Sequence, residues 1–259
     1  LDKEDTYGSD LDINLIRWDA DDTDHSSAGR EELPATMSRT PSNDGKFYRD
    51  ITVTPTQFFA DRTKEVGFAG WYPAKSDVAG NPGNKWVTRS DSDGNEYVIH
   101  PADENHSKPY MTHTIDETTD TDVMISDFVK GNYTNGIPAM EFRHALCKYN
   151  IHAYAVSEDI KSEWGKVTSI TLTNMPDSVT ILLPDDITSG DAVEFKYSKK
   201  DHPYTILSPE DEAVDLHPGM PSETTTILIG SILGGAPAAG VLGIEARTEK
   251  QGAGNSVSI

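Results

Sequence analysis

Short β-prone runs separated by turn residues constrain this sequence more than any other feature. Apolar and β-branched residues alternate over short stretches, whereas apolar residues spaced for a helix are nearly absent. Strands of this length between turns are typical of antiparallel β-sandwiches rather than of a parallel α/β sheet. We therefore expect an all-β chain, with strands at residues 11–18, 50–54, 66–71, 96–100, 121–126, 149–156, 167–173, 178–183, 192–198, 204–208, 225–233, 241–248 and 256–259.

Two segments depart from this pattern. Residues 139–148 are the best candidate for a helix, although the segment is short. Residues 224–244 carry no charged side chain and are long enough to cross a bilayer as a helix. Their five glycines and Pro237 favour instead two apolar strands around a turn. We expect a buried hairpin there, with a transmembrane helix as the alternative.

The charge of the chain argues against two classes of partner. It has 22 Lys and Arg against 43 Asp and Glu, a formal net charge of −21. A surface that binds nucleic acid or docks on anionic lipid needs an excess of cations. We therefore expect no nucleic-acid partner and no electrostatic binding to a membrane. Cys147 is the single cysteine, so no disulfide can form within the chain.

The two parts of the chain differ in the length of their expected loops and in the spacing of their expected strands. Before residue 140 long polar loops are expected, such as 19–43 and 75–94, whereas the later strands follow one another more closely. The length fits one large β domain or two domains of ordinary size. We place an N-terminal β-sandwich domain at residues 1–140 and a C-terminal one at 141–259.

The segment after this boundary is dense in apolar residues. If it joins two sandwiches, its apolar side chains should be buried where the two meet. The residues expected at or near the domain interface are Phe142, Leu146, Tyr149, Ile151 and Cys147.

Motifs for catalysis or metal binding are missing from the sequence. The acidic run at residues 19–24 lacks the glycine and the bidentate glutamate of a calcium loop, and residues 91–95 are typical of a hairpin turn with Gly94 at positive φ. No HExxH or nucleophile-elbow motif occurs, and Cys147 has only His144 nearby, without a third orienting residue. We expect no catalytic residue, no cofactor and no metal ion, and a secreted enzyme is kept only as a third hypothesis.

Four stretches together resemble one protein family. They are Tyr48-Arg-Asp-Ile-Thr-Val-Thr-Pro-Thr-Gln-Phe-Phe59, Val66-Gly-Phe-Ala-Gly-Trp-Tyr-Pro73, Thr121-Asp-Val-Met-Ile-Ser126 and Met140-Glu-Phe-Arg-His-Ala-Leu-Cys-Lys148. The second is similar to an F-x-G-W/Y-Y-P strand and the last to an L-x-F-x-H-x-L-A/S-K junction. In order and spacing they resemble the fimbrillin family of Bacteroidales-type bacteria, the Mfa-like subunits of type V pili.

The resemblance has two departures. The family often has an I-P-Q triplet where this chain has Leu228-Ile229-Gly230-Ser231, and its members commonly continue into further strands beyond the equivalent of Val257-Ser-Ile259. We therefore expect the C-terminal domain to be incomplete at its C-terminus.

The resemblance implies two tandem transthyretin-like β-sandwich domains and a structural subunit of cell-surface fimbriae that mediates adhesion. It also implies an exported lipoprotein precursor at the cell outer membrane, and other fimbrillin subunits as partners in a homo- or heteropolymer. In the family a trypsin-like protease removes an N-terminal strand, and a strand of another subunit fills the vacated groove. This is β-augmentation, in which an extended segment satisfies exposed backbone groups and apolar pockets.

The resemblance points to residues 11–18 as the exchangeable strand. Leu11, Ile13 and Leu15 alternate with other side chains, so one face of this strand can be apolar. We expect it to be a removable edge element, followed by a polar loop in which Arg30 and Arg39 are the candidate protease-processing sites. The alternative is that the strand is a permanent part of the sandwich.

A second function stays open beside the fimbrial one. A surface lipoprotein of the same fold could bind a glycan or host ligand without polymerising. Exposed aromatic side chains gathered in one loop cluster would favour it, and the candidates are Trp86, Trp164 and Tyr110.

Overall fold

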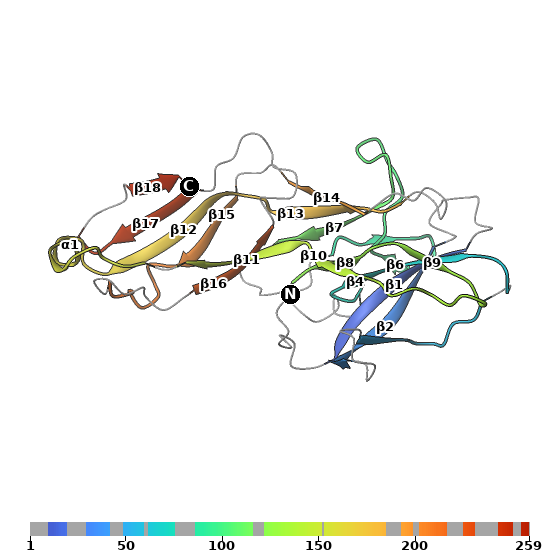
Figure 1. The fold of residues 1–259 in the computed structure, drawn as a ribbon. Coiled ribbons are helices and arrows are strands. Elements are labelled where there is room, and N and C mark those ends of the chain that lie inside the picture. Colours follow the sequence, from blue (N-terminus) through green and yellow to red (C-terminus); the bar gives the residue numbers. More distant parts are fainter. Residues whose placement is uncertain are drawn as a thin grey trace. The chain divides into compact units, whose positions relative to one another are not determined.

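The computed structural model describes residues 10–19, 30–41, 49–59, 62–75, 86–115, 122–151, 153–184, 193–198, 202–216, 225–230, 243–250 and 255–258. Over these ranges nearly every regular element is a β-strand, and there is a single short helix (Figure 1). Its larger sheets are antiparallel, so the expectation of an all-β antiparallel fold is confirmed.

The elements follow the chain in the order β1 (Leu11–Asp19), β2 (Arg30–Pro41), β3 (Arg49–Val53), β4 (Val66–Tyr72), β5 (Arg89–Ser90), β6 (Glu96–Tyr97), β7 (Tyr110–Thr114), β8 (Met124–Ser126), β9 (Val129–Gly131), β10 (Phe142–His144), β11 (Leu146–Ile151), α1 (Glu158–Trp164), β12 (Val167–Met175), β13 (Ser178–Leu182), β14 (Glu194–Tyr197), β15 (His202–Leu207), β16 (Thr225–Gly230), β17 (Gly243–Thr248) and β18 (Asn255–Ser258).

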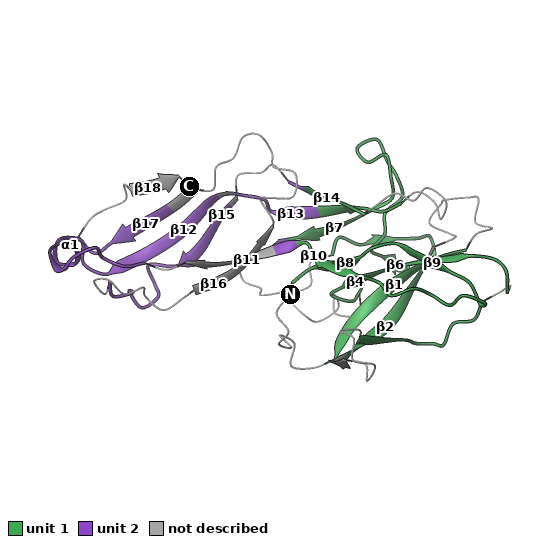
Figure 2. Ribbon diagram, viewed as in Figure 1, with its two compact units in different colours: residues 1–114, 121–145, 180–196 green, residues 115–120, 146–179, 197–259 purple. Residues whose placement is uncertain are grey.

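The chain divides into two compact units (Figure 2). Unit 1 comprises residues 1–114, 121–145 and 180–196, and unit 2 comprises residues 115–120, 146–179 and 197–259. The units therefore interleave along the sequence. Whether 1–140 and 141–259 are separate domains stays a prediction.

Unit 1 is organised around a seven-stranded sheet. Its strands follow the order β10–β8–β4–β1–β2–β3, and β9 pairs separately with β4. A three-stranded sheet, β14–β13–β7, is formed mostly from unit 1 residues. The short pair β5–β6 encloses the turn that the sequence predicts, with Gly94 at φ 82°, so that prediction is confirmed.

One apolar cluster of unit 1, which we call the sheet cluster, lies on one face of the seven-stranded sheet. Alternate residues of the central strands point into it because successive side chains of a strand face opposite sides. Its buried members are Leu11, Ile13, Leu15, Leu33, Ala35, Met37, Val66, Phe68 and Met124. Partly buried side chains from later segments, among them Phe59, Ile137 and Phe142, pack against it.

Unit 2 holds a four-stranded sheet in the order β15–β12–β17–β18 and a two-stranded sheet of β11 and β16. Tyr204 in β15 is fully buried, and its hydroxyl donates to Pro176 O at 2.8 Å. Helix α1 begins after Ser157, whose hydroxyl accepts a hydrogen bond from Ile160 N, and ends at Gly165 with φ 76°. These are ordinary helix-capping residues.

Two sequence-based expectations about local structure need correction. The helix expected at residues 139–148 is wrong, because this segment contributes to strands β10 and β11. In residues 224–244 the strands β16 and β17 occur as expected, but β16 pairs with β11 and β17 with β12, so they do not form one hairpin. Residues 231–242 lie outside the described part. No helix within the described residues is long and apolar enough to span a membrane.

Candidate strand-exchange site

Strand β1 lies in the interior of the seven-stranded sheet of unit 1. It pairs antiparallel with β2 from Leu11 to Trp18 and with β4 from Asn14 to Asp19. The expectation of an edge element is therefore wrong, because β1 has a hydrogen-bonded neighbour on each side. The polar loop expected at residues 19–43 is wrong over its second half, since residues 30–41 form β2.

The three predicted strand residues share one environment. Leu11, Ile13 and Leu15 are 7%, 0% and 3% exposed and all belong to the sheet cluster. The opposite face is buried as well from Asn14 onward: Ile16 is 0% and Trp18 is 3% exposed, and the Trp18 ring meets Phe128 edge-on at 5.0 Å. The sequence argument for a single apolar face missed this second face, because Asp12, Asn14 and Arg17 interrupt the apolar run that usually marks a strand covered on both sides.

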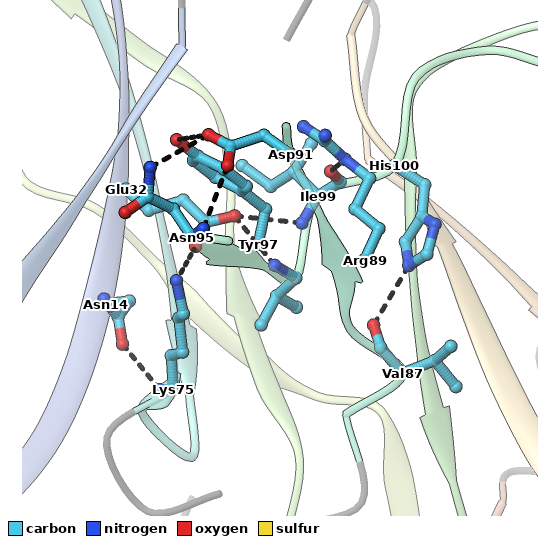
Figure 3. Close-up of polar contacts among 11 residues, drawn as sticks. Asn14, Glu32, Lys75, Val87, Arg89, Asp91, Asn95, Tyr97, Ile99 and His100 are labelled. Carbon is cyan, nitrogen blue, oxygen red and sulfur yellow. Dashed lines mark hydrogen bonds and ion pairs between the residues drawn. The ribbon is translucent and has the colours of Figure 1, made fainter. Parts of the chain in front are cut away.

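Two polar side chains of β1 are also buried. Arg17 donates through Nε and Nη2 to Asp19 Oδ1 and through Nη1 to Gln57 Oε1. Asn14 is 4% exposed, and its Oδ1 accepts a hydrogen bond of 2.7 Å from the backbone N–H of Lys75 (Figure 3). Buried polar groups are costly unless they are paired, and both of these are.

The carboxylate of Glu32, in β2, joins three segments of unit 1 (Figure 3). Its side chain is 4% exposed, and Oε1 accepts hydrogen bonds from Val98 N at 2.9 Å and Ile99 N at 3.0 Å. Its other oxygen, Oε2, lies 3.4 Å from Lys75 Nζ, an ion pair at longer range than a good hydrogen bond. Glu32 thus holds the segment after β6 and the segment after β4 against β2.

Tyr97 extends this network outward. Lys75 Nζ and the Arg89 guanidinium lie 5.1 and 4.8 Å from the centre of its ring. Its hydroxyl donates to Asp91, and this bond raises the pKa of Tyr97. Asp91 also accepts bonds from the side chain and backbone of Asn95, which lower its pKa. The β5–β6 turn is therefore fixed by its own side chains.

The two candidate processing residues lie in β2. Arg30 is the first residue of this strand and pairs with Trp18, whereas Arg39 follows Met37, the last residue of β2 that pairs with β1. Between Met37 and Pro41 the register with β3 is irregular. Their side chains are outside the described part, and processing at either residue stays a prediction.

The candidate aromatic residues do not form one exposed cluster. Trp86 is 4% exposed, and its indole Nε1 donates to Pro73 O at 2.8 Å, so it is a core residue. Trp164 ends helix α1 in unit 2, whereas Tyr110 lies in β7 of unit 1, stacked on His106 at 3.9 Å and on His100 at 5.0 Å. Among the residues that the structure describes, no group of three or more His, Cys, Asp or Glu could hold a metal ion. Of the acidic run 19–24, only Asp19 is described.

Comparison with known proteins agrees with this architecture. One solved structure with a similar fold is a candidate cell adhesion protein from Bacteroides uniformis, with a TM-score of 0.52 at 14% identity over 98% of this chain and 80% of that one. A fimbrial protein from Bacteroides vulgatus is also found, with a TM-score of 0.36 at 10% identity over 95% and 80% of the two chains. No curated protein matches the sequence. The sequence model of the fimbrillin-like family matches residues 4–231, and the chain therefore belongs to that family.

Proposed function

We propose that this protein is a structural subunit of cell-surface fimbriae that mediates adhesion and assembles with other fimbrillin subunits by strand donation. Membership of the fimbrillin-like family and the fold shared with a candidate adhesion protein support a pilus or adhesion role. The proposed location is the extracellular fimbrium at the outer membrane, with a lipid anchor on the precursor. The role is structural rather than catalytic.

The enclosure of β1 is the observation that carries the assembly mechanism. Removing this strand would leave the facing backbone groups of β2 and β4 without partners and would open apolar pockets on both sheet faces. Unpaired buried N–H and C=O groups cost about as much as lost hydrogen bonds, so the empty site would strongly favour another extended chain. A donor strand in the register of β1 restores both the backbone pairing and the apolar contacts.

The position of the two arginines favours Arg30 as the processing site. A cut after Arg30 separates β1 from the remaining residues of β2 that pair with it. A cut after Arg39 would also detach Leu33, Ala35 and Met37, which belong to the sheet cluster. Only the first cut would free β1 while keeping the β2 residues that pair with it and form one side of its site.

Digestion of the purified protein with an arginine-specific protease tests this mechanism. Cleavage after Arg30 should be followed by polymers in size-exclusion chromatography, or by uptake of a synthetic β1 peptide. Arg30→Ala should block both effects, whereas Arg39→Ala should leave them unchanged. A chain that is cut after Arg30 and yet stays monomeric, without taking up the peptide, would contradict strand exchange. Immunolabelled fibres on native cells would place the subunit in fimbriae.

One observation favours the second function, binding of a glycan or host ligand by a surface lipoprotein of the same fold. Phe58 and Tyr133 are 79% and 56% exposed, and the Arg62 guanidinium lies 4.8 Å from the centre of the Tyr133 ring. Exposed aromatic rings beside a cation are common in ligand-binding surfaces. Glycan-array binding that is lost in Tyr133→Ala and kept in Val156→Ala, with the protein monomeric throughout, would favour this function.

A further inference from the structure

We propose that the site occupied by β1 discriminates between strands at one position, that of Asn14. Strands are selected by whether the side chain at this position accepts a hydrogen bond, and we call this selection the polar test. This inference rests on the proposed strand exchange. It assigns the chemistry of the partner: an extended segment with apolar side chains at the positions of Ile13, Leu15 and Ile16, and a short hydrogen-bond acceptor at position 14.

The donor that makes this test is the backbone N–H of Lys75. It points at β1, where Asn14 Oδ1 accepts its hydrogen bond at 2.7 Å (Figure 3). Asn14 is 4% exposed, between Ile13 and Leu15 at 0% and 3%. An aliphatic side chain there would leave this partly buried N–H without its acceptor, and an unsatisfied donor costs free energy. A strand that is apolar throughout is therefore a poor occupant.

The segment that carries this donor is held by parts of unit 1 other than β1 as well as by β1 itself. Two residues before Lys75, the carbonyl of Pro73 accepts a hydrogen bond of 2.8 Å from the buried indole of Trp86. The Lys75 ammonium lies 3.4 Å from Glu32 in β2. Neither contact involves β1, so we expect both to keep the N–H directed at the vacant position when β1 is removed, and preorganised donors discriminate best.

Backbone contact alone does not provide this selectivity. Ala74 N donates to Asp12 O, a bond that any residue at position 12 can accept, and the Asp12 side chain is exposed. Asp12 is therefore a matched control for Asn14, being two residues away on the same face of β1. Positions 12 and 14 differ in side-chain burial and in what the side chain binds.

Peptide competition on the nicked full-length chain tests the inference. A site-specific protease sequence is inserted between Asp24 and His25, the chain is cut, and labelled peptides of residues 10–19 compete for the β1 position. Asn14→Ala and Asn14→Leu peptides should bind at least about tenfold more weakly than the native peptide, which corresponds to about 1.4 kcal/mol. Asn14→Asp and Asn14→Ser should bind within about threefold, and Asp12→Ala should match the native peptide.

The outcomes distinguish a failure of the polar test at position 14 from a failure of strand exchange itself. Native and Asn14→Ala peptides that enter equally well would overturn the polar test and leave strand exchange intact. A native peptide that never enters would overturn strand exchange and this inference with it. In the intact chain, Asn14→Ala should speed amide hydrogen exchange at Lys75 at least about tenfold while Asp12→Ala leaves it unchanged. Unchanged protection at Lys75 in Asn14→Ala would also overturn the polar test.

Discussion

The ring of Phe142 occupies the space that a side chain at Gly70 would need. A Cβ built on Gly70 would lie 2.6 Å from Phe142 Cζ and 3.0 Å from Leu15 Cδ2. Gly70 pairs with Leu15 of β1, so the contact lies against the candidate exchangeable strand. The F-A-G-W-Y-P stretch and the junction that begins at Met140, quoted separately for the family resemblance, therefore meet here in space.

Gly70→Ala should destabilise the protein by about 1–3 kcal/mol, the usual cost of overpacking a core. The reason is steric, because the new methyl group overlaps the Phe142 ring. Chemical denaturation measures the loss. Combined with Phe142→Leu, which withdraws the ring atoms, the loss should be smaller than the sum of the two single changes by about 0.5 kcal/mol or more. If the two losses of stability are strictly additive, Gly70→Ala and Phe142→Leu are not energetically coupled, and the steric contact is not the cause of the loss.

Leu146→Ala should lower the free energy of unfolding by about 2–5 kcal/mol, the range for a buried leucine. Leu146 begins β11 and is 7% exposed. Val156→Ala serves as the control, since Val156 is 78% exposed and its truncation should cost less than about 0.5 kcal/mol. A loss of that small size for Leu146→Ala would place its side chain in solvent.

Strands can be predicted from the sequence where apolar residues alternate clearly. The prediction fails for β2, where charged residues and a proline accompany the alternating apolar residues. In β2 the alternating residues Leu33, Ala35 and Met37 carry the signal for a strand, but the two glutamates before them and Pro34 among them favour a loop. With β2 taken for a loop, β1 has no neighbour on that side and is predicted at an edge. Pairing partners depend on distant segments, so the central place of β1 could not be read from β1 alone.

The helix was also mispredicted: it was expected at residues 139–148, where strands occur, and α1 was missed. Residues 139–148 are apolar enough for a helix, yet pairing with β8 and β16 decides their structure. Helix α1 has no buried residue and so no apolar periodicity, and its signals are the cap Ser157, the acidic first turn and Gly165. The polar contacts of Glu32 were equally hidden, because they join β2 to Val98 and Ile99 across more than 60 residues of sequence.

The ion pair of His144 with Asp122 should make stability depend on pH. The two side chains are 2.5 Å apart, and the hydrogen bond to Asp122 raises the pKa of His144 above 6.5, although burial opposes it. The stabilisation is fully present below pH 6.5 and is lost as the pH rises through the raised pKa of the folded state. His144→Gln should remove this slope from unfolding curves measured against pH. An unchanged slope would assign the pH dependence to another group.

Asp103 should titrate far below an ordinary aspartate. Its pKa falls to about 2, chiefly through the hydrogen bond from the Tyr110 hydroxyl, and the pKa of Tyr110 rises to about 12 through burial and the same bond. Any stability from this pair is present above pH 3.8 and lost as the pH falls through about 2. Tyr110→Phe should raise the pKa of Asp103 toward 3.8 in an NMR titration, whereas Tyr97→Phe should leave it unchanged. An equal response to both would exclude a direct effect of Tyr110.

Glu32→Ala should cost about 2–4 kcal/mol, because the amides of Val98 and Ile99 then lose their acceptor in a poorly hydrated place. Glu32→Gln keeps a side-chain oxygen and should cost clearly less, since Lys75 is partly exposed and can turn to water. Glu31→Ala, at the exposed neighbouring position of β2, should change stability by less than about 0.5 kcal/mol. Amide hydrogen exchange at Val98 and Ile99 should accelerate in Glu32→Ala alone. If Glu32→Ala behaves like Glu31→Ala in both measurements, Glu32 does not hold this segment, and the preorganisation of the Lys75 N–H would rest on the Trp86 contact to Pro73.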